Sequence, residues 1–391
     1  MEHILRCHDF VKDDMVKGDN CYLYDKNNKR YVDFEAGIWC TVLGHSNSRV
    51  NRVTADQIGK IIHLGPRYTS RLAEDAASSL LETISEEHGK CVFLSSGSEA
   101  VELGISVAKL ITGKRLLLTL SESYLGAYGS SSTASSDWVK IDVDKCISCK
   151  EIRCLKSCAN LEKVSFDDIC AFVFEPGSSS GKVKFPPDKL IDLLVKEIRD
   201  SGGLIIVDEV STGFGRTGKW YGFNHYGIEP DIIAFGKGLG NGYPISAVAM
   251  KREIAQELEG RNLRYVQSHQ NDPLGCAIAS EVIKIIREDD LVSRSHALGS
   301  KFIGRLNELG NGLPFVKEIR GRGLMASIEL SESKPNLNVE SISNQMLKRG
   351  FIIGFNPNAS LMRFLPPLTI PEKEIENMVE SLDHVLTGQA H

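Results

Sequence analysis

The chain has 391 residues, a length that predicts two or three domains of about 150 residues each. Its 46 Lys and Arg residues are outnumbered by 51 Asp and Glu residues, and the formal charge of −5 excludes a general nucleic-acid-binding surface. No apolar run approaches the roughly 18 residues that cross a membrane, and the charged amino-terminal residues do not resemble a secretory signal. We therefore expect a cytoplasmic protein without nucleic-acid or membrane partners.

In chain order, residues 20–45 are predicted to form short strands around an Asn-Asn turn. From about residue 48 to 255, apolar runs alternate with helical patterns, which favours a mostly parallel sheet with crossover helices. The predicted strands are KCVFLSS, KRLLLTL, ICAFVFEP, GLIIVDE, PDIIAF and ISAVAM, and the predicted helices cover residues 70–88, 98–112 and 187–201. After residue 270, one or two helices are followed by the apolar runs GLMASIEL, GFIIGF and ASLMRFLPPL.

These patterns predict an α/β protein with two domains. Residues 45–255 are expected to form the large domain. Residues 1–44 and 256–391 are expected to form a smaller α+β domain from both ends of the chain.

Lys237 is the first candidate for chemistry. It follows the apolar run of DIIAF and lies between Gly236 and Gly238, where the backbone can turn sharply. A lysine near the carboxyl edge of a sheet can be desolvated and become nucleophilic. The plain alternative is a solvated loop lysine.

Asp208 ends the apolar run of GLIIVDE, so its carboxylate is expected at the same edge of the sheet as Lys237. A lysine and an aspartate that oppose each other across a crevice suit pyridoxal phosphate. The lysine forms the Schiff base, and the carboxylate keeps the pyridine nitrogen protonated. The alternative for Asp208 is a cap that binds loop amides.

A phosphate site is predicted where residues 95–98 connect a strand to a helix, because free amides and the positive helix end attract an anion. An ordinary serine N-cap is the alternative. The glycines of GLGNG at 238–242 do not indicate a dinucleotide site, because the strand-like run ISAVAM follows them instead of a helix.

Together these features resemble the class III aminotransferases, which are pyridoxal-phosphate enzymes of fold type I with a mostly parallel, seven-stranded type of sheet in the large domain. The resemblance covers residues 18–386 and is most specific over 208–248, around the lysine. SSGSEAVE at 95–102 is similar to the phosphate loop of the family. SHQNDPL at 268–274 is similar to a loop that reaches the neighbouring subunit's cofactor, and MRFLPPLTI at 362–370 to the segment with the carboxylate-binding arginine.

The resemblance implies the site residues. Lys237 would form the Schiff base and transfer protons, and Asp208 would pair with the pyridine nitrogen. The other implied cofactor contacts are Gly97, Ser98, Tyr124, Ser211 and, from the neighbouring subunit, Ser268; the implied substrate contacts are Arg363, Glu175 and Trp39. If Arg363 does not bind a substrate carboxylate, it is expected to pair with a nearby acid such as Glu175.

The implied activity is transfer of an amino group from a carboxylate-bearing donor, an ω-amino acid or an amino acid, to a 2-oxo acid, by a homodimer or a dimer of dimers. Two departures argue against the ornithine, acetylornithine and 4-aminobutyrate assignments. Ala127 stands where many members have a second arginine, and Ser211 stands where glutamine is frequent. An amino-acid racemase or aminomutase of the same fold is the alternative.

Four cysteines match no feature of the family. Cys146, Cys149, Cys154 and Cys158 follow the spacing C-x2-C-x4-C-x3-C, and four thiolates can hold zinc or an iron–sulfur cluster. The spacing matches neither a two-knuckle zinc site nor the common ferredoxin run, so reduced surface cysteines or redox-labile pairs are the favoured interpretation. A redox- or metal-sensing protein built on this fold is the third hypothesis.

Overall fold

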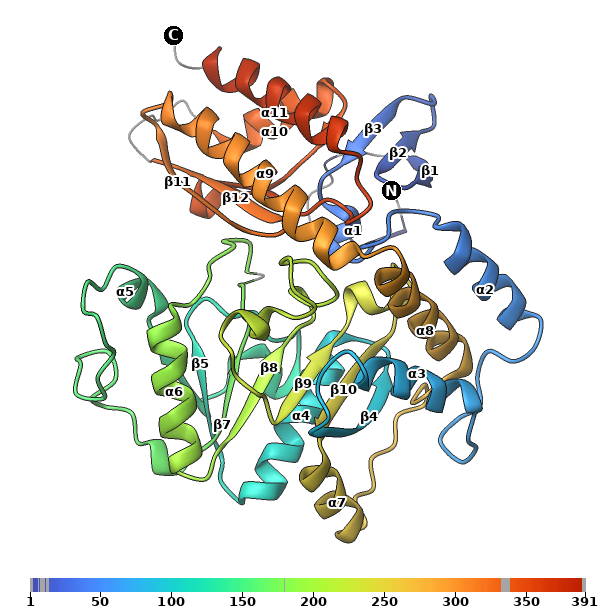
Figure 1. Cartoon of the computed structure of the whole chain (residues 1–391), viewed down its shortest axis with the longest axis vertical. Coiled ribbons are helices and arrows are strands. Elements are labelled where there is room, and N and C mark those ends of the chain that lie inside the picture. The colour runs from blue at the N-terminus through green and yellow to red at the C-terminus, as the bar shows by residue number, and fades with distance from the viewer. Residues whose placement is uncertain are drawn as a thin grey trace.

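A seven-stranded sheet forms the centre of the computed structural model, which describes residues 3–5, 7, 11, 14–178, 180–331 and 338–388 (Figure 1). The strand order is β4-β10-β9-β8-β7-β5-β6, and only β10 runs against its neighbours β4 and β9. The strands are β4 (His88–Leu94), β5 (Leu116–Leu120), β6 (Trp138–Ile141), β7 (Ile169–Phe174), β8 (Leu204–Asp208), β9 (Ile232–Phe235) and β10 (Ser246–Lys251).

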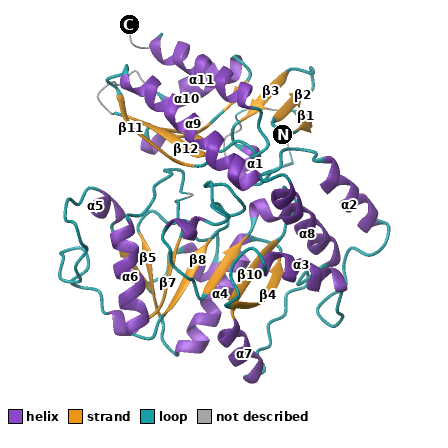
Figure 2. Cartoon of the chain, viewed as in Figure 1, coloured by secondary structure: helices purple, strands orange, loops and turns teal. Residues whose placement is uncertain are grey.

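Helices cover both faces of this sheet, which is why its strands are continuous apolar runs (Figure 2). On one face, α4 (Gly97–Thr112) packs with Ile206 of β8 and Ile232 of β9. On the other face, α6 (Asp188–Asp200) packs with Ile205 and Val207 of β8. Alternate residues of β8 thus pack into two apolar layers, one on each face of the sheet.

Beside the same sheet, α8 (Pro273–Glu288) packs against α2 (Ser48–Ile58) and α3 (Arg71–Leu81). The helix predicted over 70–88 is wrong at its carboxyl end, because α3 stops at Leu81 and β4 begins at His88. The hydroxyl of Thr83 donates to the carbonyl oxygen of Leu80 at 2.6 Å and so satisfies a group left open at the end of the helix.

Two smaller sheets lie above the large one in Figure 1. The first has the order β1-β2-β3-β13, and its parallel pair β3 and β13 joins the amino-terminal part of the chain to the carboxyl-terminal part. The second is antiparallel with the order β11-β12-β15-β14. Their strands are β1 (Met15–Asp19), β2 (Tyr22–Asp25), β3 (Arg30–Asp33), β11 (Val316–Arg322), β12 (Met325–Leu330), β13 (Phe351–Ile352), β14 (Gly354–Asn356) and β15 (Leu361–Phe364).

The remaining helices are α1 (Ala36–Trp39), α5 (Val143–Ile147), α7 (Arg252–Gly260), α9 (Leu291–Asn311), α10 (Val339–Lys348) and α11 (Glu372–Thr387). No helix in the described ranges is both long enough and apolar enough to pass through a lipid bilayer. The exact division into residues 45–255 and the two chain ends stays a prediction.

Candidate active site

Lys237 lies just beyond the carboxyl end of β9, where the short 3₁₀ turn η4 (Lys237–Gly240) begins. Its φ of +40° places a residue other than glycine in the left-handed region, a strained conformation that directs the side chain off the end of the strand. Nζ of Lys237 donates to Oγ of Ser211 at 2.5 Å. Burial lowers the pKa of this lysine, against the opposing effect of Asp208.

Asp208 is the last residue of β8 and is 4% exposed. Its Oδ1 accepts a hydrogen bond from the backbone amide of Val210 at 2.9 Å. Burial raises the pKa of Asp208 to about 7, although the Val210 amide and Lys237 both act to lower it. A buried carboxylate whose pKa is raised and that faces a charged partner in a cavity is a candidate functional group.

Glu209 follows Asp208 but has a structural environment. It is fully buried and accepts hydrogen bonds from the hydroxyl of Thr212 and from the amides of Gly222 and Phe223, all at 2.7–2.9 Å. These contacts tie the strand end to the loop that follows it.

Lys237 and Asp208 share one cavity of about 210 Å³ with residues from the start of α4 and the loop after β5. The cavity is lined by Gly97, Ser98, Tyr124, Leu125, Gly126, Asp208, Val210, Ser211 and Lys237. The structure therefore brings together every predicted cofactor contact except Ser268.

The start of α4 supplies two backbone amides to this cavity. Ser96 caps the helix, and the carboxylate of Glu99 accepts from the amides of Ser95 and Ser96 at 3.0 and 2.8 Å. Gly97 and Ser98 are the first two residues of the helix, so their amides have no acceptor within it. A Cβ at Gly97 would lie 2.8 Å from Cγ2 of Val210, which explains the glycine at this position.

The three predicted substrate contacts lie around the cavity. The ring centroid of Trp39, from α1, lies 4.6 Å from Nζ of Lys237 and 5.0 Å from Cζ of Arg363 on β15. Glu175 is 2% exposed, and its Oε2 accepts from the amide of Tyr124 at 2.8 Å. Trp39 thus lies between Lys237, which follows β9 of the large sheet, and Arg363 on β15 of a smaller sheet.

The ion-pair partner of Arg363 differs from the predicted one. Glu35, not Glu175, receives Nε and Nη2 of Arg363 at 3.0 and 3.3 Å. Glu35 follows β3 and its importance was missed in the sequence. The sequence EAGIW carries no signal of this role, because the positive φ values of Ala36, Ile38 and Trp39 are visible only in the structure.

Ser268 is exposed and does not line the cavity of its own subunit. Its neighbour Gln267 donates to Oγ of Ser95 and to Oε1 of Glu99, at 3.2 and 3.1 Å. The loop therefore lies beside the start of α4.

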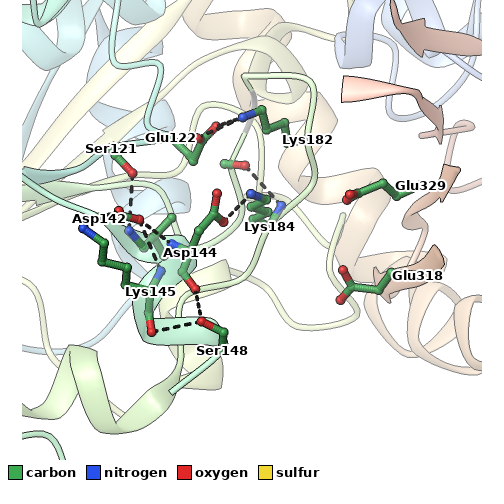
Figure 3. A network of polar contacts seen from close by, with 12 residues as sticks. Ser121, Glu122, Asp142, Asp144, Lys145, Ser148, Lys182, Lys184, Glu318 and Glu329 are labelled. Carbon is green, nitrogen blue, oxygen red and sulfur yellow. Dashed lines mark hydrogen bonds and ion pairs between the residues drawn. The ribbon is translucent and has the colours of Figure 1, made fainter. Parts of the chain in front are cut away.

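The segment with the four cysteines connects β6 to β7 and is held at both ends. Figure 3 shows its amino-terminal end, where Asp142 caps α5 and Lys184 pairs with Asp144. Further along, Lys189 donates to the carbonyl of Cys149 at 2.9 Å, and Asn160 donates to Sγ of Cys146 at 3.1 Å. None of the ten cysteines, all of which lie in the described residues, forms a disulfide.

The sulfur atoms are not gathered at coordination distance. Across the part of the chain that the structure describes, one group of at least three ligand atoms lies within 4.8 Å, and it consists of His63, His269 and Asp272. Metal binding by the cysteines stays a prediction.

The cavity fits pyridoxal phosphate in three respects. The amides at the start of α4 could hold the phosphate, the carboxylate of Asp208 could pair with the pyridine nitrogen, and the desolvated amine of Lys237 could attach the aldehyde carbon. The fold and this cavity define a pyridoxal-phosphate-dependent enzyme of fold type I.

Comparison with known proteins identifies the family within that class. The family "Aminotransferase class-III" matches residues 8–386, so the chain belongs to the class III aminotransferases and is a pyridoxal-phosphate-dependent enzyme that uses an amino donor and a 2-oxo acid. It is similar to acetylornithine aminotransferase of Archaeoglobus fulgidus, with 31% identity over 97% of each chain.

Two further similarities span almost the full length. Leucine/methionine racemase of Thermococcus litoralis is 29% identical over 95% of this chain and 90% of its own. An aminotransferase of Bacillus anthracis has a similar structure, with a TM-score of 0.89, 26% identity, and coverage of 97% of this chain and 94% of that one.

Proposed function

We propose that this aminotransferase moves an amino group from a carboxylate-bearing donor, an ω-amino acid ahead of an α-amino acid, to a small 2-oxo acid in the cavity around Lys237. One observation carries the proposal: Lys237 and Asp208, with pKa values shifted toward each other by burial, face the same cavity at the start of α4. When bound, pyridoxal phosphate supplies the electron-accepting ring on which amino-group chemistry depends.

Lys237, Ser211 and Asp208 would each have a separate role in the reaction. Lys237 would attach the cofactor and then, once released, carry the proton that leaves the carbon bearing the donor's amino group. Its hydrogen bond to Ser211 would hold Nζ in the cavity between these steps. Asp208 would keep the proton on the pyridine nitrogen, because its buried carboxylate favours a cationic partner.

The other contacts would position the two reactants. Gly97 and Ser98 would bind the phosphate through their amides, and Tyr124 would stack on the ring. Arg363 would bind a substrate carboxylate, Trp39 would line the entrance, and Glu175 would set the charge of the cavity.

The expectation of substrates with a single carboxylate rests on Ala127. Its side chain offers no charge, and its amide donates to Oγ of Ser98 at 3.0 Å, so no second arginine reaches the cavity from this position. A substrate with one carboxylate suits such a site, and pyruvate is expected to serve as acceptor as well as 2-oxoglutarate.

We also propose that the chain forms a homodimer or a dimer of dimers in which Ser268 of the partner subunit contacts the phosphate. Large apolar side chains are exposed at the end of α2 and on the two loops that His63 and Asp272 join at 2.7 Å. These side chains are Ile58, Ile61, Ile62, Tyr68, Leu263 and Val266. A second copy would cover them, and two-fold assembly is the commonest arrangement. A cytoplasmic location stays a prediction.

A racemase is the second candidate, supported by the similarity to leucine/methionine racemase. The same lysine and aspartate would serve, but no amino group would leave for an oxo acid. The test is a donor panel with pyruvate and 2-oxoglutarate, followed by chiral analysis of the amino acids. Appearance of alanine or glutamate supports transfer, and inversion of the donor without either product supports the racemase.

A further inference from the structure

One bidentate edge of the Arg363 guanidinium, formed by Nε and Nη2, is already bound by Glu35. Nε donates to Oε1 of Glu35 at 3.0 Å, and Nη2 donates to Oε2 at 3.3 Å. These are two parallel bonds to one carboxylate, the geometry by which arginine recognises carboxylates in general. A substrate carboxylate can form the same two bonds only after Glu35 has left.

Trp39 and Gly354 lie on either side of the pair of Glu35 and Arg363. Nε1 of Trp39 donates to Oε1 of Glu35 at 3.4 Å, and the ring of Trp39 lies against Arg363. Gly354, which faces Arg363 across β14 and β15, leaves the space that the carboxylate fills, since a Cβ there would lie 1.9 Å from Oε1 of Glu35. Both side chains are largely buried, with exposed fractions of 11% for Glu35 and 17% for Arg363.

The backbone of Glu35 is fixed separately from its carboxylate. The carboxylate of Asp33 accepts from the amides of Glu35 and Ala36 at 2.8 and 3.0 Å, and from the amide of Gly37 at 3.1 Å. Asp33 is held in turn by Nε2 of His45 at 2.8 Å. Release of Arg363 therefore requires a side-chain movement of Glu35 and no refolding of the segment.

We infer that Glu35 determines substrate specificity by competing with substrate carboxylates for Arg363. This inference rests on the proposed function. With the pair closed, the guanidinium is neutralised, and an amine without a carboxylate meets a wall formed by Trp39 and an ion pair. A carboxylate substrate that takes this edge of the guanidinium displaces Glu35 from two charge-assisted bonds, so the binding of carboxylates is weakened while the binding of simple amines is not.

The test is Glu35→Gln in the holoenzyme, with propionate as the probe. Propionate has a carboxylate but neither an amino nor an oxo group, so its binding can be measured by calorimetry without turnover. We expect the dissociation constant of propionate and the KM of pyruvate to fall about tenfold, the order of one charge-assisted hydrogen bond. The ratio of kcat/KM for pyruvate to kcat/KM for the donor 1-phenylethylamine should rise by a similar factor.

Two further variants complete the design. Glu281→Gln breaks a similar arginine pair, with Arg49 at 2.6 Å, away from the cavity, and should leave propionate binding unchanged. Glu35→Ala should shift propionate binding in the same direction as Glu35→Gln, which covers the case in which one variant folds poorly.

Unchanged or weaker propionate binding in the folded Glu35 variants would overturn the inference, because Glu35 would then only position Arg363. An equal change in kcat/KM for pyruvate and for the simple amine would do the same. If the native enzyme transfers no amino group while propionate binding follows the expected pattern, the proposed function fails and the competition stands.

Discussion

Among single residues, Asp208 has the most informative pKa, because burial raises it from 3.8 to about 7. A carboxyl group whose pKa is raised on folding stabilises the folded protein below its unfolded pKa, and this contribution is lost as the pH rises through the folded value. In the cofactor-free protein, the free energy of unfolding should therefore fall between about pH 4 and pH 7.

Asp208→Asn should reduce this decrease in the free energy of unfolding of cofactor-free protein. The measurement is urea unfolding at several pH values. Part of the slope should persist, because burial also raises the pKa of Glu209 to about 7. An unchanged slope in the variant would show that Asp208 is already ionised over this range.

Arg363→Lys should weaken the binding of substrates that carry a carboxylate by about 2 kcal/mol, because an ammonium group cannot form the two parallel hydrogen bonds of a planar guanidinium. Simple amines and the cofactor should bind as before. The measurement is kcat/KM for one ω-amino acid and one carboxylate-free amine. An equal loss for both donors would assign Arg363 a structural role with Glu35.

Individual elements differ in how far the sequence predicts them. The strands of the large sheet are predictable because each is a continuous apolar run, as in β7, whose residues are all buried. The 98–112 and 187–201 helices also match α4 and α6 within one residue at each end. The reversal of β10 is less visible, since it follows from the absence of a crossover helix between β9 and β10 in this described stretch.

The lysine, the aspartate and the start of α4 were predictable as a group because each follows a strand of one sheet and must meet the others at its carboxyl edge. The pair of Glu35 and Arg363 was not. It joins residues 328 positions apart, and the contact depends on how the two smaller sheets lie over the cavity. Local patterns carry no information about such a contact.

The segment from β6 to β7 offers a prediction at the scale of one element. If the four cysteines bind metal, anaerobically purified protein should contain about one zinc ion or one iron–sulfur centre per chain. Replacement of Cys146 and Cys149 together should remove the metal and leave the cofactor absorption unchanged, since the segment is not part of the cavity. Fully active protein without metal would favour reduced, structural cysteines.

For the whole molecule, the exposed apolar loops and Ser268 predict that the dimer is the active unit. Light scattering should give the mass of two or four chains. Val266→Glu, in a side chain that is 75% exposed, should favour the monomer by burying a charge in the interface and should lower cofactor retention in parallel. Lys284→Glu, an exposed change on the outer face of α8, is the control. A fully active monomer would contradict the shared site.

The central claim is that Lys237 attaches the cofactor and carries the transfer of the amino group. Its most direct test is mass spectrometry of peptides from holoenzyme treated with borohydride, which fixes the cofactor to the lysine that holds it. The expected result is one cofactor mass on the peptide that contains Lys237, and neither that mass nor amine transfer to pyruvate in the folded Lys237→Ala variant. Attachment at another lysine, or undiminished transfer by the variant, would contradict the account.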